Sequence, residues 1–380
     1  MNFNLTEEQL MIQQAARDFA QSELLPEVIE RDRDQKFPHE QVKKMAELGF
    51  LGMMVDPKYG GAGLDAVSYV VAMEEIAKVD ASAAVIMSVN NSLVCAGIEK
   101  YASEEQKQKY LVPLAKGEVI GAFALSEPEA GSDATSQSTT AVDMGDYYLL
   151  NGTKNWITNG GNATYYVVIA QTNPEKKHKG INAFIVEKGW EGFEIGAKED
   201  KLGIRGSDTH TLLFNDVKVP KENRIGEDGF GFNFAMAVLN GGRIGIASQA
   251  LGIAAGAYEL ALKYAQTRKA FKTEIINHQA IAFKLADMHV NVTAARMLVY
   301  KAASEKDEGK DISESGAMAK LYASQVAMDT SIEAVQIHGG YGYVKEYHVE
   351  RMMRDAKITQ IYEGTSEIQK IVISRAIAKK

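Results

Sequence analysis

The sequence has one cysteine, Cys95, in 380 residues. A single cysteine excludes an intrachain disulfide, a cysteine-cluster metal site and CxxC redox chemistry, and it favours a reducing compartment. The seven histidines are scattered, and none stands in an H-E-x-x-H motif. His348 and Glu350 resemble the start of a zinc deaminase signature, but the cysteine pair of that signature is absent. A G-x-S-x-G elbow is also missing, so a hydrolase of that type has no nucleophile. We therefore expect no metal site.

Basic residues are in deficit as well, since 42 Lys and Arg stand against 50 Asp and Glu and give a net charge of −8. This balance argues against nucleic-acid binding, which usually requires a basic surface. No run approaches about 18 uninterrupted apolar residues, so we expect no transmembrane helix. The start, MNFNLTEEQL, lacks the basic region and apolar run of a signal peptide. We expect a soluble cytoplasmic protein, or a mitochondrial matrix protein if the sequence is a processed mature form.

The hydrophobic pattern changes twice along the chain. Thr6 and Gln9 form a capping box that opens the first helical pattern. Helices with a 3.6-residue period are expected near 6–25, 39–49, 65–79 and 82–118. From residue 121, short β-rich runs such as YYVVIAQT and NAFIVEKG are separated by Gly, Asn and Asp, which predicts an antiparallel sandwich or barrel. Long helices are then expected near 231–266, 277–305 and 314–337.

This order of patterns predicts an α+β protein of several domains, because 380 residues are too many for one small core. We expect an all-α N-terminal domain over residues 1–120 and a central β domain over residues 121–230. The last domain, over residues 231–380, is expected to be an α bundle, since long amphipathic helices with short connections favour that arrangement.

Several glycine-rich motifs have both a structural and a functional interpretation. FALSEPEAGSDA (123–134) is either a plain turn or a set of backbone N–H groups facing an anionic or carbonyl ligand. NWITNGG (155–161) offers a tryptophan for the core or for a flat wall against an aromatic ring. QIHGGYGY (336–343) ends a helical pattern in a C-cap or in a close approach to a ligand. GAGLDA (61–66) matches G-x-G-x-x-A, but no strand leads into it, so we interpret it as a turn.

The stretch IYEGTSEIQ (361–369) precedes the last helical pattern. Ser366 and Gln369 fit a capping box, which predicts a helix that begins near Ser366. Glu363 then lies just before the positive end of that helix, where acids are common for electrostatic reasons alone. Its own surroundings in the sequence leave two possibilities open, a loop carboxylate and a catalytic base.

Together these stretches resemble the acyl-CoA dehydrogenase family. The resemblance is carried by LSEPEAGSDA, NWITNGG, DKLGIRGSDT, LNGGRIGIASQALGIA, RKAF, QIHGGYGY and RDAKITQIYEGTSEIQ, in the family's order and over essentially the whole chain. It implies an all-α N-terminal domain, a central antiparallel β domain and a C-terminal four-helix bundle.

The resemblance also implies bound FAD between the β domain and the C-terminal helices, reached by a neighbouring subunit as well. The flavin-contacting turn falls on Phe123, Ala124, Leu125, Ser126, Gly131 and Ser132, and the wall of the isoalloxazine ring on Trp156, Ile157 and Thr158. Contacts to the flavin or its ADP portion fall on Arg268, Lys269, Ala270, His278 and Gln279. The pyrophosphate-proximal loop of the partner falls on Gln336, Ile337, His338, Gly339 and Gly340, and the last flavin contacts on Thr365, Ser366 and Glu367.

The implied reaction is α,β-desaturation of an acyl-CoA thioester to the trans-2-enoyl-CoA, with Glu363 as the general base. Some family members carry the base instead just before the arginine of LNGGR, but here that position is Gly242. Arg243 is expected to be a substrate anchor or part of a structural ion pair. The implied substrate contacts are Ser132, Leu239, Asn240, Gly242, Arg243 and Gly364.

The stretch LNGGRIGIASQALGIA looks most like short-chain, butyryl-type members of the family. The family implies an electron-transfer flavoprotein as electron acceptor and a homotetramer built as a dimer of dimers. A branched-chain or other acyl-CoA dehydrogenase, or an oxidase of the same fold, remains an alternative. A non-catalytic member of the fold that binds nucleic acid is the alternative from another class, and the negative net charge argues against it.

Overall fold

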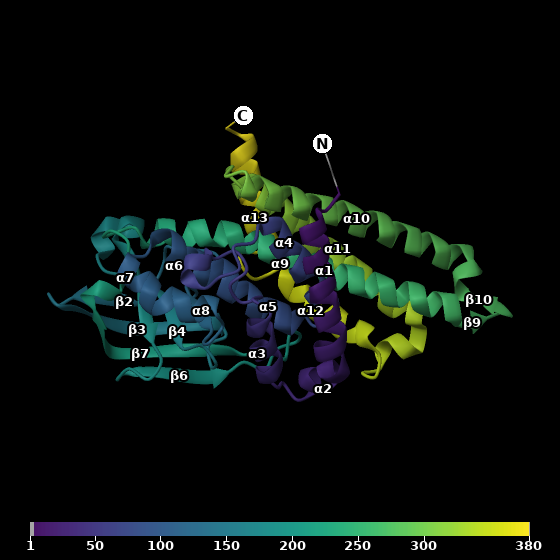
Figure 1. Ribbon diagram of the computed structural model, residues 1–380, viewed down its shortest axis with the longest axis horizontal. Helices are drawn as coiled ribbons and strands as arrows, with labels where there is room; N and C mark the ends of the chain where they lie inside the picture. Colours follow the sequence, from purple (N-terminus) through teal and green to yellow (C-terminus); the bar gives the residue numbers. More distant parts are fainter. Residues whose placement is uncertain (1–3, 380) are drawn as a thin grey trace.

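The computed structural model describes residues 4–379, in which helices precede and follow a β-sheet (Figure 1). The N-terminal part is helical, and α1 begins with the expected capping box. The Gln9 N–H donates to Thr6 Oγ1 over 3.2 Å, and the Thr6 N–H donates to Gln9 Oε1 over 3.0 Å. The helices of this part are α1 (Glu7–Phe19), α2 (Val28–Arg33), α3 (His39–Glu47), α4 (Ala66–Ala77), α5 (Ala81–Ser88), α6 (Ala96–Tyr101), α7 (Glu104–Gln106) and α8 (Val112–Ala115).

Two local expectations in this part have different outcomes. GAGLDA is a turn, as predicted: Gly60 and Gly63 have φ of 84° and 65°, and Asp65 caps α4. The continuous helix expected over 82–118 is wrong, because Ala102 adopts an extended conformation and Ser103 starts α7 with a capping box of its own. A second S-x-x-Q signal inside the apolar pattern therefore marks a helix boundary.

The sheet follows the β-rich runs. Its strands are β1 (Gly121–Ala124), β2 (Thr140–Asp143), β3 (Tyr147–Thr158), β4 (Tyr165–Gln171), β5 (Ile181–Glu187), β6 (Phe193–Lys198), β7 (Thr209–Pro220) and β8 (Arg224–Ile225). Their order is β6-β7-β3-β2-β4-β5-β8, with β1 beside β4. Most neighbours are antiparallel, as expected, but β1 and β2 each pair with β4 in parallel.

The apolar run of β4 is explained by burial on both faces of the sheet. Val167 and Ile169 pack into the core shared with the helices, whereas Tyr166 and Val168 pack into a second core formed by strands. Because successive side chains of a strand point to opposite faces, a strand covered on both sides shows no alternation of polar and apolar residues.

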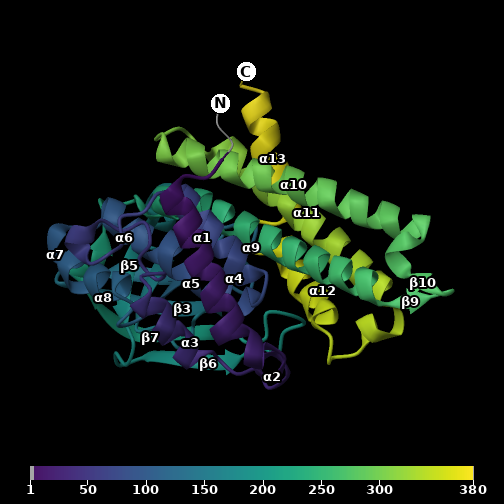
Figure 2. The ribbon, with the colours of Figure 1, turned by 45° about the vertical axis from the view of Figure 1, so that its right-hand side comes forward.

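The C-terminal part consists of long helices that extend from the sheet to a small hairpin, and Figures 1 and 2 both place that hairpin at the end of the bundle away from the sheet. Its elements are α9 (Gly231–Thr267), β9 (Lys269–Ala270), β10 (Thr273–Glu274), α10 (Gln279–Asp307), α11 (Ser313–His338), α12 (His348–Thr359) and α13 (Ser366–Ile377). The three long helices therefore lie where the sequence predicts them.

Two helical stretches are long and apolar enough to cross a membrane, although neither is an uninterrupted apolar run. These are Ala81–Tyr101 and Gly231–Thr267, and 94% and 83% of their most apolar windows are buried within the protein. Helices in the interior of a protein have the same composition, so this feature is weak evidence for a membrane span.

Helix α9 approaches α4 closely through glycines. A Cβ atom on Gly252 would lie 2.5 Å from both Ala77 Cβ and Glu74 O, and one on Gly256 would lie 2.5 Å from Lys78 O. These distances are far below van der Waals contact, so the packing of the two helices depends on the missing side chains.

We expect Gly252→Val to lower the midpoint of thermal unfolding, because forcing extra atoms into a packed contact typically costs about 1–3 kcal/mol. The matched control is Gly241→Ala in the same helix, where the added Cβ would meet only Ser92 O at 3.9 Å. That substitution should leave the midpoint unchanged or raise it, since Ala is favoured over Gly within a helix by about 1 kcal/mol. Equal midpoints for both variants would contradict the close-packing interpretation.

Candidate active site

Glu363 lies in the short loop between α12 and α13, and its backbone is strained. Glu363 has φ of 52° and Gly364 has φ of 92°, so two consecutive residues occupy the left-handed region. Glycine adopts this conformation freely, but a residue with a Cβ atom pays about 1–3 kcal/mol for it, and such strain persists mainly at functional sites. Within residues 4–379, the backbone N–H groups of Glu363 and Gly364 have no hydrogen-bond acceptor.

The loop is held by donors to its carbonyl groups. Lys320 Nζ donates to Gly364 O over 2.6 Å, and Gln369 Nε2 donates to the same oxygen over 2.8 Å. Gln369 Nε2 also lies 3.3 Å from Glu363 O. The predicted capping box of Ser366 and Gln369 is therefore wrong. Thr365 is the N-cap, accepting from the Ile368 N–H over 3.4 Å, and the Gln369 side chain satisfies the loop carbonyls instead.

The Glu363 carboxylate lies against helix α9. A Cβ atom on Gly242 would overlap Glu363 Oε2 and would lie 2.7 Å from Leu93 Cδ2. Oε2 is buried and has no hydrogen-bond partner among the described residues. Burial raises the pKa of Glu363 to about 7, while the charges of Lys320 and Arg243 act in the opposite direction. A half-ionised carboxyl group near neutral pH is suited to accept a proton.

Arg243, the residue that follows Gly242 in α9, is buried but forms no ion pair with Glu363 among the described residues. Its Nη1 donates to Asn240 Oδ1 over 2.7 Å, and its Nε has no partner. Burial lowers the pKa of Arg243, and the nearby Glu363 opposes this effect. The structure therefore does not contain the ion pair that was one of the two expectations for Arg243. Among the described residues, the buried guanidinium near the carboxylate keeps an N–H group without an acceptor, which a ligand could fill.

The predicted substrate residues are only partly brought together. Asn240, Gly242 and Arg243 lie within one turn of α9. The Gly364 carbonyl is linked to this region through Lys320, whose charge acts on both Glu363 and Arg243. Leu239 is half-buried on the same helix. Ser132 is exposed in the turn that follows β1, and no hydrogen bond or ion pair within residues 4–379 joins it to Glu363.

Sequence reasoning missed Lys320 and Tyr362, and it gave Gln369 a capping role in place of its contacts with the loop carbonyls. Lys320 is fully buried in α11 between Ala317, Ala319 and Ala323. A lysine on a helix face of small apolar residues is the signal that could have identified it, since buried lysines are rare. Tyr362 donates its hydroxyl to Gln249 Oε1, which ties the loop to α9.

Two of the predicted flavin segments lie side by side, one at the end of β1 and the other near the end of β3. The Asn155 N–H donates to Ser126 O over 2.9 Å, and the buried Lys154 Nζ donates to Leu125 O over 3.0 Å. Lys154 also pairs with the buried carboxylate of Glu127, with 2.7 Å between Nζ and Oε1. These bonds fix Phe123–Ser126 against the strand that carries Trp156.

A β-bulge turns Trp156 out of the sheet. Lys154 pairs with Leu212 and Ile157 with His210, so β3 has one more residue than β7 across this interval. Trp156 has φ of 62°, and its side chain is 59% exposed. The hydroxyl of Thr158 makes no side-chain hydrogen bond within residues 4–379. An exposed indole beside a free hydroxyl is a suitable wall for a planar, polar ring.

The remaining segments form two further groups. Arg268, Lys269, Ala270, His278 and Gln279 lie at the β9–β10 end of the bundle, far from the sheet (Figure 2). The end of α11, with Gln336, Ile337, His338, Gly339 and Gly340, is close to them, since the Arg268 guanidinium lies 5.5 Å from the Tyr341 ring and His338 stacks on Tyr264. Ile337 and His338 are buried, whereas a Cβ atom on Gly339 or Gly340 would meet nothing within 4 Å. Thr365, Ser366 and Glu367 start α13 beside Glu363.

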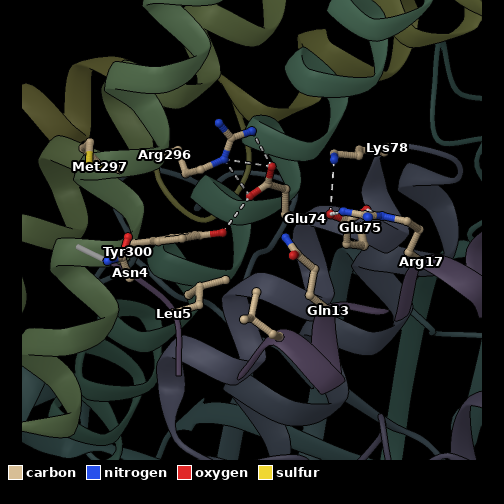
Figure 3. Close-up of a pocket in the computed structure, with 11 residues that line it drawn as sticks. Asn4, Leu5, Gln13, Arg17, Glu74, Glu75, Lys78, Arg296, Met297 and Tyr300 are labelled. Carbon is tan, nitrogen blue, oxygen red and sulfur yellow. Dashed lines mark hydrogen bonds and ion pairs between the residues drawn. The ribbon is translucent and has the colours of Figure 1, made fainter. Parts of the chain in front are cut away.

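A second cluster of charges surrounds a pocket of about 480 Å³ between α1, α4 and α10 (Figure 3). Its buried carboxylates already have partners: Arg296 and Tyr300 donate to Glu74, and Arg17 and Lys78 pair with Glu75. These ion pairs and hydrogen bonds join α4 to α1 and α10, which favours a structural role for both carboxylates. Among residues 4–379, no group of three His, Cys, Asp or Glu could hold a metal ion.

Comparison with known proteins covers almost the whole chain. Residues 6–118, 122–217 and 229–378 match the N-terminal, middle and C-terminal domains of acyl-CoA dehydrogenases. A short-chain specific acyl-CoA dehydrogenase of Clostridium acetobutylicum is 54% identical over 99% of this chain and 100% of its own length.

Solved structures agree with this match. Butyryl-CoA dehydrogenase from Megasphaera elsdenii has a TM-score of 0.98 at 50% identity, with 100% of both chains covered. A chain in a structure of the electron transferring flavoprotein of Acidaminococcus fermentans has a TM-score of 0.99 at 52% identity, again with 100% of both chains covered. The predicted arrangement of a helical N-terminal part, a middle sheet and a helical C-terminal part is confirmed, and the chain belongs to the acyl-CoA dehydrogenase family.

Proposed function

We propose that this chain desaturates short-chain acyl-CoA thioesters between the α and β carbons, with Glu363 as the general base. The observation that carries the proposal is the buried Glu363 carboxylate, which lies in the space left by Gly242 and has a pKa raised to about 7. A thioester α-proton is far less acidic than a carboxylic acid, so a base of ordinary strength needs this environment and nearby hydrogen-bond donors.

The residues of this chain fit FAD, the cofactor that the family implies. Trp156 offers an exposed flat ring, and Gly131, Gly339 and Gly340 leave their backbones open. When bound, FAD supplies the acceptor for the β-hydride at its N5 atom. The segments 123–132 and 156–158 are proposed to hold the flavin, whereas 268–279 and 336–340 lie at the opposite end of the bundle. We propose that a second copy contributes these latter segments, in a homotetramer formed as a dimer of dimers.

The loop residues have distinct proposed roles. Glu363 accepts the α-proton at its carboxylate, and its free backbone N–H donates to the thioester carbonyl as negative charge develops there. Gly364 carries no side chain, so the backbone is open to the substrate. Arg243 and Lys320 place two positive charges near the carboxylate, which favours charge accumulation on the substrate.

The proposed acceptor of the electrons is an electron-transfer flavoprotein, and the proposed location is the cytoplasm. The names of the relatives support both the short-chain preference and this partner, since one is short-chain specific and another chain comes from a structure of an electron transferring flavoprotein. One alternative is a preference for branched chains, which the substrate profile distinguishes from a short-chain preference. The other is direct oxidation by oxygen, which would need no electron carrier.

We expect anaerobic butyryl-CoA to bleach the flavin absorbance of the purified holoenzyme. Glu363→Gln should retain FAD but lower the bleaching rate by roughly a hundredfold to ten-thousandfold, because an amide cannot accept the α-proton. The measurement is stopped-flow absorbance across straight and branched acyl-CoAs. Asp329→Asn, which changes one exposed residue of α11, is the control and should bleach at the normal rate.

Two results would count against the proposal in different ways. Undiminished bleaching in Glu363→Gln would show that another group removes the proton. Failure of every acyl-CoA to bleach the wild-type flavin would favour a non-catalytic member of the fold.

The bleaching rate should rise with pH through about 7 and level off above it. The reason is that Glu363 must be ionised to accept a proton, and burial raises its pKa to about 7. An ordinary glutamate, with a pKa of about 4.3, would give a flat profile over this range. A profile that is flat between pH 5.5 and 8.5 would therefore remove the raised pKa from the mechanism.

A further inference from the structure

We propose that Lys320 is a positioning residue for Glu363, which holds the strained loop through the Gly364 carbonyl and places a positive charge near the carboxylate. The inference rests on the proposed function, since it assigns a role in the same reaction. It concerns a side chain on α11, a helix distant in sequence from the loop that carries the base.

The burial of Lys320 is the first argument. Its side chain is fully buried, and within residues 4–379 its ammonium forms no ion pair within 4.0 Å. In the described part of the chain, the ammonium makes one hydrogen bond, the 2.6 Å contact to Gly364 O. Removing an ammonium group from water is costly unless it is compensated, and a methionine of similar length would fill the same space at no such cost. The positive charge of Lys320 therefore has a role other than filling space in the core.

The loop geometry indicates the first part of that use. Glu363 and Gly364 have φ of 52° and 92°, and their backbone N–H groups make no internal hydrogen bond within the described chain. The carbonyl of Gly364 accepts from two donors, Lys320 on α11 and Gln369 on α13. These two bonds fix the orientation of the peptide group that follows Gly364. A loop held in this way keeps the strained conformation that the proposed N–H donor requires.

The charges around Glu363 indicate the second part. Lys320 from α11 and Arg243 from α9 both favour its ionised form. Tyr69 from α4 and Tyr362 from the loop also face it, but both hydroxyls are neutral, since burial raises their pKa. Within the described residues, Lys320 is therefore one of two cations that oppose the effect of burial on the carboxylate. Without it, the base would be protonated up to a higher pH.

Three substitutions separate the hydrogen bond from the charge. Lys320→Arg keeps the charge, Lys320→Gln keeps a donor without charge, and Lys320→Met keeps neither. Each is measured as purified holoenzyme by the pH profile of butyryl-CoA bleaching, by kcat and KM, by FAD content and by the midpoint of thermal unfolding. Asp329→Asn, an exposed change on the same helix, is the control.

The acid limb of the profile is the pH range over which the bleaching rate rises to its plateau. We expect it to shift to higher pH by roughly one unit in Lys320→Gln and Lys320→Met, as is typical when a nearby opposite charge is lost. At pH values above the limb, Lys320→Gln should recover most of the wild-type kcat, whereas Lys320→Met should stay about tenfold lower because the loop has lost a donor. Lys320→Arg should keep the wild-type limb. FAD content and KM should change little in all three variants.

A wild-type acid limb in Lys320→Gln would overturn the proposal, and so would equal kcat values for the Gln and Met variants above the limb. If Lys320→Met fails to fold, the comparison of the Gln and Arg variants still decides the role of the charge. These failures differ from failure of the proposed function, in which the wild-type enzyme itself is not bleached by any acyl-CoA.

Discussion

The site depends on one absence, the missing side chain of Gly242. Because helix α9 has no Cβ atom at this position, the Glu363 carboxylate can lie against it and lose contact with water. Burial in turn raises the pKa of the carboxyl group, and the two cations nearby limit that rise. The same helix approaches α4 through Gly252 and Gly256, so glycines position α9 at both the site and the core. Small residues thus determine where the chemistry takes place.

Much of the fold follows from local signals in the sequence. Thr6 and Gln9 form the capping box that their spacing predicts, and the three long C-terminal helices lie where the hydrophobic period places them. The same spacing fails at Ser366 and Gln369, because the carbonyl groups of the loop compete for the glutamine side chain. Local patterns are reliable where no distant group competes for the same donor.

The site could be predicted only in part, and for a related reason. Glu363 and Gly242 were identified through the resemblance to a family, and the structure places them in contact. Lys320 was missed because its significance depends on the approach of α11 to a loop that lies 44 residues further along the chain. The predicted flavin residues lie at opposite ends of the bundle, and the proposed explanation is a contact between two copies of the chain. The local pattern of one chain cannot predict such a contact.

The length of α9 has a consequence for how such a chain can change over time. One helix carries Gly242 against the loop, Gly252 against α4 and the connection to the β9–β10 hairpin. A single inserted residue would rotate everything beyond it by about 100° and displace it by about 1.5 Å. Each of the later contacts would then face a wrong neighbour. Substitutions along α9 can accumulate one at a time, but a change in its length must come in steps close to whole turns, and insertions are therefore expected in the loops instead.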